Sequence, residues 1–105
     1  MVASIADYQN ATPKSALNIS VSTVVKAAPG AVLGVIVLSG TAPGGSVNDC
    51  TSVASAAAAN EVMPIPSGAA VLSQPAEGLF NSPLPCLVGI TVVPPPGGTV
   101  SVFFA

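Results

Sequence analysis

The residues of this chain that could do chemistry are two cysteines and four carboxylates. Cys50 directly follows Asp49, and Cys86 lies far along the chain. A nucleophilic cysteine must ionise easily, but a neighbouring carboxylate raises the pKa of a thiol and so opposes ionisation. The chain also contains no His, the usual base beside a nucleophilic Ser or Cys and the commonest metal ligand. This pattern predicts no nucleophilic site.

The carboxylates do not form a catalytic pair or a cluster either. Acid–base catalysis by two carboxylates requires both in one cleft, and the candidate pairs are Asp49 with Glu61 and Glu61 with Glu77. Each of these residues lies in a different loop-like segment. A calcium site needs several oxygen ligands close together, which scattered acids do not provide. We therefore predict that the protein is not an enzyme and that it has no catalytic residue, metal ligand or cofactor.

Structural roles are predicted instead for Asp49 and the two cysteines. The side-chain oxygens of Asn48 and Asp49 are suited to closing an Asx turn or capping a strand end. The N-terminus has no basic segment followed by a continuous apolar one, so we expect synthesis in a reducing cytoplasm. Cys50 and Cys86 are then expected to be two buried thiols. A disulfide between them is the alternative if the protein ends up outside the cell.

The low charge of the chain restricts its partners. Charged residues make up 6% of the sequence and the net charge is -2, whereas about 25% charged residues is typical. Two lysines cannot neutralise a run of phosphates, so neither nucleic acid nor an anionic membrane is a predicted partner. An uncharged surface is easily desolvated, which favours a subunit covered by neighbouring proteins. The alternative is a monomer with a hydroxyl-rich surface.

Hydrophobic residues make up 50% of the chain, but their arrangement does not predict a membrane span. The longest apolar stretch, residues 27–40, contains Pro29, Gly30 and Gly34. It is shorter than the roughly 20 residues that a spanning helix needs. Aromatic residues are only 4%, so the core must consist mainly of Val, Ile, Leu and Ala.

Most of the chain has the pattern of short β-strands. Leu17, Ile19 and Val21 alternate with polar residues, which predicts a strand with these three side chains on one face. Pro29-Gly30 predicts a type II turn that joins this strand in a hairpin to residues 31–40. The latter segment is apolar on both faces and is therefore the predicted central strand.

Further strands and loops follow the same signals. Pro43-Gly44 predicts a turn, and Pro64 and Pro66 predict an edge strand or an extended connection. The alanine-rich residues 54–60 predict a loop or a single helical turn. The other predicted strands are residues 47–53, 68–73, 86–94 and 99–105, and residues 74–85 are predicted to form an exposed loop. In the last strand Val100, Val102 and Phe104 share one face.

These elements predict one all-β domain. We expect a single antiparallel β-sandwich or jelly-roll-like barrel of about six to eight short strands over residues 17–105. Residues 1–16 show no clear period and are predicted to form an extended N-terminal arm. Apolar residues outside the alternating core are the candidates for partner binding. They are Val2, Ile5 and Tyr8 in the arm, and Leu79 and Phe80 in the proline-bounded loop.

The order of the motifs resembles a known group of proteins. VVKAAPG is followed by VLGVIVLSGTAPGGSVNDC, then AAAANEV, IPSG and LPCLVGITVVPPPGGTVSV. From Asn18 to Val102 this order resembles small structural proteins of tailed-bacteriophage virions, of the capsid decoration (cement) type. The loop at residues 74–85 and the triple proline depart from the family pattern.

The resemblance implies a structural function. A decoration protein binds the outside of a phage capsid and stabilises contacts between major capsid subunits, often as a homodimer or homotrimer. The implied location is the virion exterior, after assembly in the host cytoplasm. An alternative is a head-fibre or tail-associated module that recognises a host-surface receptor or glycan.

Overall fold

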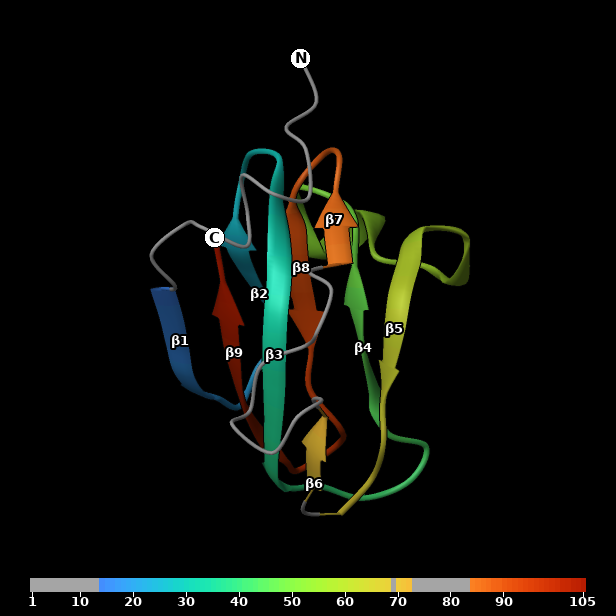
Figure 1. The fold of residues 1–105 in the computed structure, drawn as a ribbon. Coiled ribbons are helices and arrows are strands. Elements are labelled where there is room, and N and C mark those ends of the chain that lie inside the picture. The colour runs from blue at the N-terminus through green and yellow to red at the C-terminus, as the bar shows by residue number, and fades with distance from the viewer. Residues whose placement is uncertain (1–13, 69, 73–83) are drawn as a thin grey trace.

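Two antiparallel β-sheets pack face to face in this protein (Figure 1). The computed structural model describes residues 14–68, 70–72 and 84–105. The first sheet has the order β1 (Lys14–Ile19), β9 (Thr99–Phe104), β3 (Gly30–Ser39) and β6 (Ala70–Leu72), and β7 (Leu84–Cys86) also pairs with β3. The second sheet has the order β2 (Thr23–Lys26), β8 (Ile90–Val93), β4 (Gly45–Asn48) and β5 (Glu61–Ile65). The predicted all-β sandwich is therefore confirmed.

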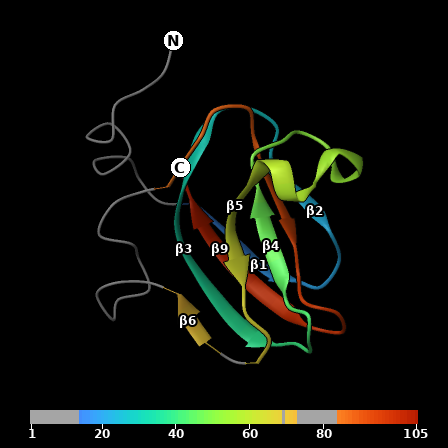
Figure 2. The same cartoon turned by 90° about the vertical axis from the view of Figure 1, so that its right-hand side faces the viewer.

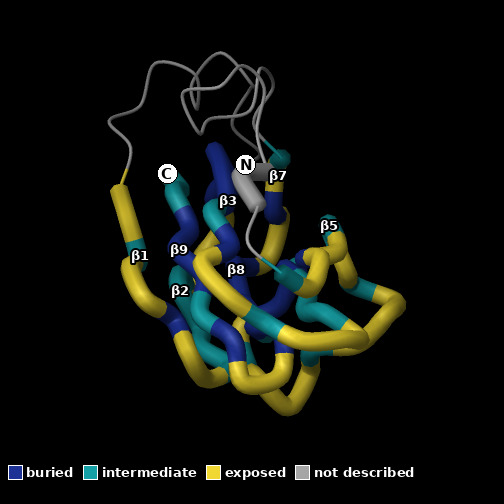
Figure 3. The backbone as a smooth tube through the Cα atoms, turned by 90° about the horizontal axis from the view of Figure 1, so that it is seen from below, coloured by how far each residue is buried: buried dark blue, intermediate teal, exposed yellow. Residues whose placement is uncertain are grey.

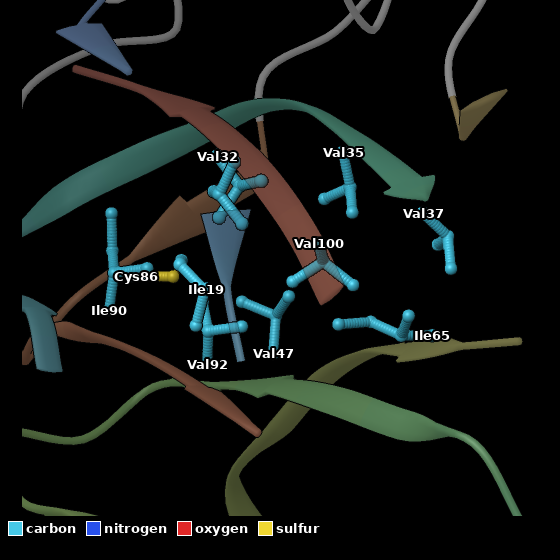
Figure 4. Close-up of a cluster of buried hydrophobic side chains, with 11 residues drawn as sticks. Ile19, Val32, Val35, Val37, Val47, Ile65, Cys86, Ile90, Val92 and Val100 are labelled. Carbon is cyan, nitrogen blue, oxygen red and sulfur yellow. The ribbon is translucent and has the colours of Figure 1, made fainter. Parts of the chain in front are cut away.

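The core between the layers is aliphatic. Figure 2 shows β3 and β6 on one side of the molecule and β2 and β4 on the other, and Figure 4 shows side chains from both sheets meeting between them. Phe104 packs against this cluster and is only partly buried. The buried members are Ile19, Val32, Val35, Val37, Val47, Ile65, Cys86, Ile90, Val92, Val100 and Val102.

Strand β3 is central, as its continuous apolar sequence predicts. It pairs with β9 along one side and with β6 and β7 along the other. Figure 3 shows that the buried residues concentrate in β3, β8 and β9, whereas much of β1 is exposed. The alternation predicted for β9 is also confirmed, because Val100 and Val102 are fully buried and Phe104 packs on the same core.

The predicted hairpin between the first strand and the central strand is wrong. β2 pairs with β8 in the second sheet, while β3 lies in the first sheet. The chain therefore crosses between the layers at residues 27–29 instead of folding back within one sheet. Gly30 is the first residue of β3 and is not among the residues with positive φ, so the predicted type II turn is not formed either.

The face predicted for Leu17, Ile19 and Val21 is also wrong. Strand β1 begins at Lys14, and its register with β9 shifts between Ala16 and Ile19. Asn18 takes a left-handed conformation there (φ 57°), which Asn tolerates better than most residues. This β-bulge leaves Ile19 buried but exposes 62% of Leu17. Val21 lies beyond the strand and is 69% exposed.

Two other predicted strands differ from the structure. The strand expected over residues 47–53 ends at Asn48, and two 3-10 turns, η1 (Val53–Ser55) and η2 (Ala58–Asn60), occupy the alanine-rich segment. The strand expected over residues 86–94 is divided into β7 and β8, which lie in different sheets. By contrast, β5 is an edge strand that contains Pro64, as predicted.

Candidate functional site

Three loops meet at one end of the sandwich, the upper end in Figure 1. They are the β2–β3 loop (27–29), the segment between β4 and β5 (49–60) and the β7–β8 loop (87–89). Gly89 lies where they converge, because a Cβ at this position would be only 2.8 Å from the carbonyl oxygens of both Lys26 and Cys50. The loops are thus packed backbone to backbone, and no side chain larger than hydrogen fits between them.

The β7–β8 loop is held by a single side chain. The Asp49 carboxylate accepts backbone hydrogen bonds from Leu87 (3.0 Å, to Oδ2) and from Val88 and Gly89 (2.8 and 3.1 Å, both to Oδ1). Asp49 has a structural role, but not in the predicted Asx turn, because its partners are 38 to 40 residues away in sequence. Asp49 therefore joins the end of β4 to the chain crossing from β7 to β8.

These hydrogen bonds determine the charge state of Asp49. Burial by itself would raise the pKa of the carboxyl group, but the backbone hydrogen bonds from Val88, Gly89 and Leu87 outweigh it and lower the pKa below its usual value. Hydrogen bonds donated to a carboxylate favour its ionised form. Asp49 is consequently ionised at neutral pH while it holds the loop.

Asp49 is itself fixed by the segment that carries it. Its backbone N–H donates to the carbonyl of Asn60 (2.8 Å), and the carbonyl of the next residue, Cys50, accepts from the Thr91 hydroxyl (2.8 Å). The buried Asn48 side chain donates to the Ala57 carbonyl and to Oδ1 of Asn60, both at 2.9 Å. This polar network orders a segment that has little regular secondary structure.

The two cysteines lie beside this contact. Both are buried and free, in line with the predicted unbridged thiols. Burial, the negative charge of Asp49 and the neighbouring Cys50 raise the pKa of Cys86 to about 12. The Cys50 thiol donates to the Ser52 carbonyl (3.3 Å). Because only the thiolate is a good nucleophile, Cys86 is protected from reaction at neutral pH.

Apolar side chains project from these loops. Leu87 is 57% exposed, Val88 is 51% exposed and Val53, in η1, is 43% exposed. The tip of the β2–β3 loop, residues 27–29, is exposed as well. We call this set the apex surface, and it consists of Ala27, Ala28, Pro29, Val53, Leu87 and Val88.

A second group of exposed apolar residues lies away from the apex surface. Leu17 in β1 (62% exposed) and Leu38 near the end of β3 (49%) are both in the first sheet, with β9 between their strands. Their chain neighbours Ala16 and Val37 contact the core, whereas Leu17 and Leu38 lie at register shifts of β1 and β3 and project away from it. We call Leu17 and Leu38 the outer-face pair.

Few charged residues accompany these surfaces. Within residues 14–68, 70–72 and 84–105 the charged residues are Lys14, Lys26, Asp49 and Glu61. None belongs to the apex surface or to the outer-face pair, and the Asp49 carboxylate is engaged by the β7–β8 loop. The members of both surfaces are therefore apolar, although Lys26 adjoins residues 27–29 and the Asp49 carboxylate lies at the β7–β8 loop.

The residues predicted from sequence to bind partners cannot be placed on this surface. Val2, Ile5, Tyr8, Leu79 and Phe80 all lie outside the described residues. Leu87 and Val88 were missed, because the run from Cys86 to Pro94 has the composition of one buried strand. The available signal was Gly89, which interrupts this run, but nothing local indicates that Asp49 binds the loop.

Comparison of the chain with protein-family models, with curated proteins and with solved structures finds no match. Among the described residues, no helix has the length and apolar character needed to cross a membrane. The same residues contain no group of three or more His, Cys, Asp or Glu side chains placed to hold a metal ion.

Proposed function

We propose that this protein is a structural virion protein that binds the outside of a phage capsid and stabilises contacts between major capsid subunits. The observation that carries the proposal is the apex surface, where the Asp49 hydrogen bonds hold Leu87 and Val88 more than half exposed. An ordered loop with adjacent apolar side chains loses little conformational entropy on binding and gains apolar burial.

The composition and the fold support the same proposal. An aliphatic β-sandwich with 6% charged residues is inexpensive to desolvate, which suits a subunit covered by other proteins. The proposed partners are the major capsid protein, through the apex surface, and a second or third copy of this chain, through the outer-face pair. The proposed location is the capsid exterior, reached after assembly in the host cytoplasm.

The sheet edges favour association through faces and loops over strand addition. The register of β1 shifts at Asn18, and that of β2 shifts between Val24 and Lys26. On the other edge of the second sheet, β5 contains Pro64, which has no N–H to donate. Bulges, prolines and charges at edges are the features by which sheets avoid open-ended pairing.

Capsids that lack the protein provide the test of this function. Shells assembled from the major capsid protein of the same virus are mixed with the purified chain, co-sedimented and then heated. We expect saturable binding and rupture at a higher temperature, because a ligand of the assembled state stabilises that state by mass action. Replacing Leu87→Ser and Val88→Ser together should abolish binding. The control is Val21→Ser, which changes a more exposed apolar residue in the β1–β2 connection at the opposite end (Figure 1).

Two results would contradict the proposal. If the wild-type chain does not bind shells, or binds without changing their rupture temperature, the decoration function is wrong. Binding to whole host cells or to their surface glycans, with no binding to shells, would support the receptor-recognising alternative. That alternative has one supporting feature, because binding loops of β-sandwiches are commonly grouped at one end.

A further inference from the structure

The backbone of the β7–β8 loop presents three consecutive N–H groups to one carboxylate. The N–H groups of three consecutive residues, Leu87, Val88 and Gly89, all point at the Asp49 carboxylate. Such a run of convergent N–H groups is an anion-binding nest. Without the carboxylate, all three N–H groups would lose their acceptor and would need water in its place. The Asp49 carboxylate is thus the group that satisfies this stretch of backbone.

The carboxylate reaches the nest from a fixed position. Hydrogen bonds hold the backbone on both sides of the Asp49 side chain. The N–H of Asp49 donates to the Asn60 carbonyl, and the Thr91 hydroxyl donates to the Cys50 carbonyl. Gly89 is packed against the carbonyl oxygens of Lys26 and Cys50, so the end of the loop cannot move independently. Only the two residues with large apolar side chains, Leu87 and Val88, remain directed to solvent.

We propose that Asp49 is a positioning residue of the apex surface: its ionised carboxylate holds the conformation in which Leu87 and Val88 are displayed, so that docking requires Asp49 to be charged. This inference rests on the proposed function for the identity of the partner, a capsid subunit that offers an apolar groove to Leu87 and Val88. The effect of Asp49 on the loop itself does not depend on that identity.

Four other ionisable residues lie next to the segments that form this contact. Cys50 follows Asp49, Cys86 precedes the loop, Lys26 ends β2 with its carbonyl at Gly89, and Glu61 follows Asn60. Cys86 stays protonated, since its pKa is about 12. The two carboxyl groups among these residues belong to Asp49 and Glu61. A variant that lacks only the Asp49 charge distinguishes the effect of Asp49 from that of Glu61.

The experiment measures loop order and docking separately. Amide hydrogen exchange at residues 87–89, followed by NMR on the free full-length chain, reports the loop. Co-sedimentation with the shells described above reports docking. The variants are Asp49→Asn, Asp49→Gly and the doubly substituted Leu87→Ser/Val88→Ser, which keeps all three N–H donors.

We expect Asp49→Asn to accelerate exchange at Val88 by about tenfold or more and to weaken docking by a similar factor. Docking of the wild-type chain should be lost only as the pH falls through the folded-state pKa of Asp49, which lies below its usual value, whereas docking of Asp49→Asn should be weak at every pH. Added formate should slow exchange in Asp49→Gly, because this small carboxylate fits the vacated nest, while chloride at equal ionic strength should not. The Leu87→Ser/Val88→Ser chain should lose docking but keep slow exchange.

The possible results separate this inference from the proposed function. If Asp49→Asn exchanges and docks like the wild type, the inference is overturned while the decoration function stands. Fast exchange in Asp49→Asn with unchanged docking also overturns it, because the loop conformation then does not matter to the partner. If the wild-type chain does not dock at all, the proposed function and the docking requirement fall together, and hydrogen exchange alone decides whether Asp49 holds the loop.

Discussion

Oδ1 of Asp49 lies 2.8 Å from the backbone nitrogen of Val88, across 39 residues of sequence. Asp49 directly follows a strand of the second sheet, and Val88 lies in the loop that leaves the first sheet for the second. This hydrogen bond and its two neighbours therefore connect the layers at one end of the sandwich. Core packing connects the layers elsewhere, so this end can be perturbed while the core is left intact.

Removing the Asp49 charge should lower stability in a pH-dependent way. The folded-state pKa of Asp49 lies below its ordinary value, so its contribution is fully present above the unfolded-state pKa. It is lost as the pH falls through the lower, folded-state pKa. At pH 7 we expect Asp49→Asn to cost about 1 kcal/mol, less than a buried charged hydrogen bond, because the donors are partly exposed.

Urea denaturation of the wild-type chain and Asp49→Asn, at several values between about pH 7 and pH 2, checks this prediction. The difference in unfolding free energy should shrink below about pH 4 and vanish in strong acid. A difference that stays constant over the whole range would show that the substitution acts through packing and not through charge. Glu61→Gln, which changes an exposed carboxylate, is the control.

A cavity in the aliphatic core should be much more costly than the same change at the surface. Ile90 is fully buried and faces the core, whereas Val21 is 69% exposed. Because the removed atoms leave a cavity that aliphatic neighbours only partly fill, Ile90→Ala should lose about 2–5 kcal/mol. Val21→Ala should stay within about 0.5 kcal/mol of the wild type. Urea denaturation of both variants gives the comparison, and similar costs would show that the core is loosely packed.

Local sequence patterns predicted the strands better than their partners. The continuous apolar run identified β3, and the alternation of Val100 and Val102 identified β9, because burial on one or both faces is expressed in the strand's own residues. The residues of β2, by contrast, do not indicate that this strand pairs with β8. A turn signal at Pro29-Gly30 is equally compatible with a hairpin and with a crossing between sheets, and tertiary packing decides between them.

The candidate site was the least predictable part for a related reason. The run Leu87–Val92 has strand composition throughout, yet the chain changes sheets within it. The interruption is maintained by the Asp49 carboxylate, whose position beside the loop depends on the whole fold. Similarly, the bulge at Asn18 reverses the expected exposure of Leu17. In both places a large apolar side chain, Leu87 or Leu17, is exposed because of contacts that the local sequence does not indicate.

Cys86 should be unreactive in the folded protein. Burial, the Asp49 charge and Cys50 hold the pKa of its thiol at about 12, so at pH 8 about one molecule in ten thousand carries the thiolate. We expect iodoacetamide at pH 8 to leave Cys86 unmodified in the native chain and to modify both cysteines once urea unfolds it. Peptide mass spectrometry identifies the modified residue. Rapid native modification of Cys86, or a mass showing a Cys50–Cys86 disulfide in freshly made protein, would contradict the buried free thiol.

Substitution by alanine should lower stability at two glycines, Gly45 and Gly97, for different reasons and by different amounts. A Cβ on Gly45 would lie 2.1 Å from the carbonyl oxygen of Val93 and 2.7 Å from Pro94 C. Gly45→Ala must therefore move the backbone of a neighbouring segment, at about 3 kcal/mol or more. Gly97 has φ +65° but open space around its Cβ position, so Gly97→Ala should cost only the left-handed conformation, about 1 kcal/mol.

Gly97→Asn separates conformational strain from a clash at Gly97. Asn tolerates the left-handed region, so this variant should be more stable than Gly97→Ala, although its side chain is larger. Thermal unfolding of the three variants orders them. If Gly97→Asn is the less stable of the two Gly97 variants, steric contact and not backbone conformation limits this turn.

Self-association should depend on the outer-face pair and not on the apex surface. Leu17 and Leu38 are both about half or more exposed on an uncharged part of the first sheet, and burying them in a second copy would remove apolar area from water. We expect the wild-type chain to sediment as a dimer or trimer at micromolar concentration, and Leu17→Ser/Leu38→Ser to shift it to monomer. Leu87→Ser/Val88→Ser should keep the wild-type oligomer.

The oligomer should also resist salt. Since no ion pair is expected in such an interface, raising the salt concentration from about 0.05 to about 1 M should not dissociate it. A wild-type chain that is monomeric at all concentrations would refute self-association, and dissociation by salt would place the interface at the few charged residues instead.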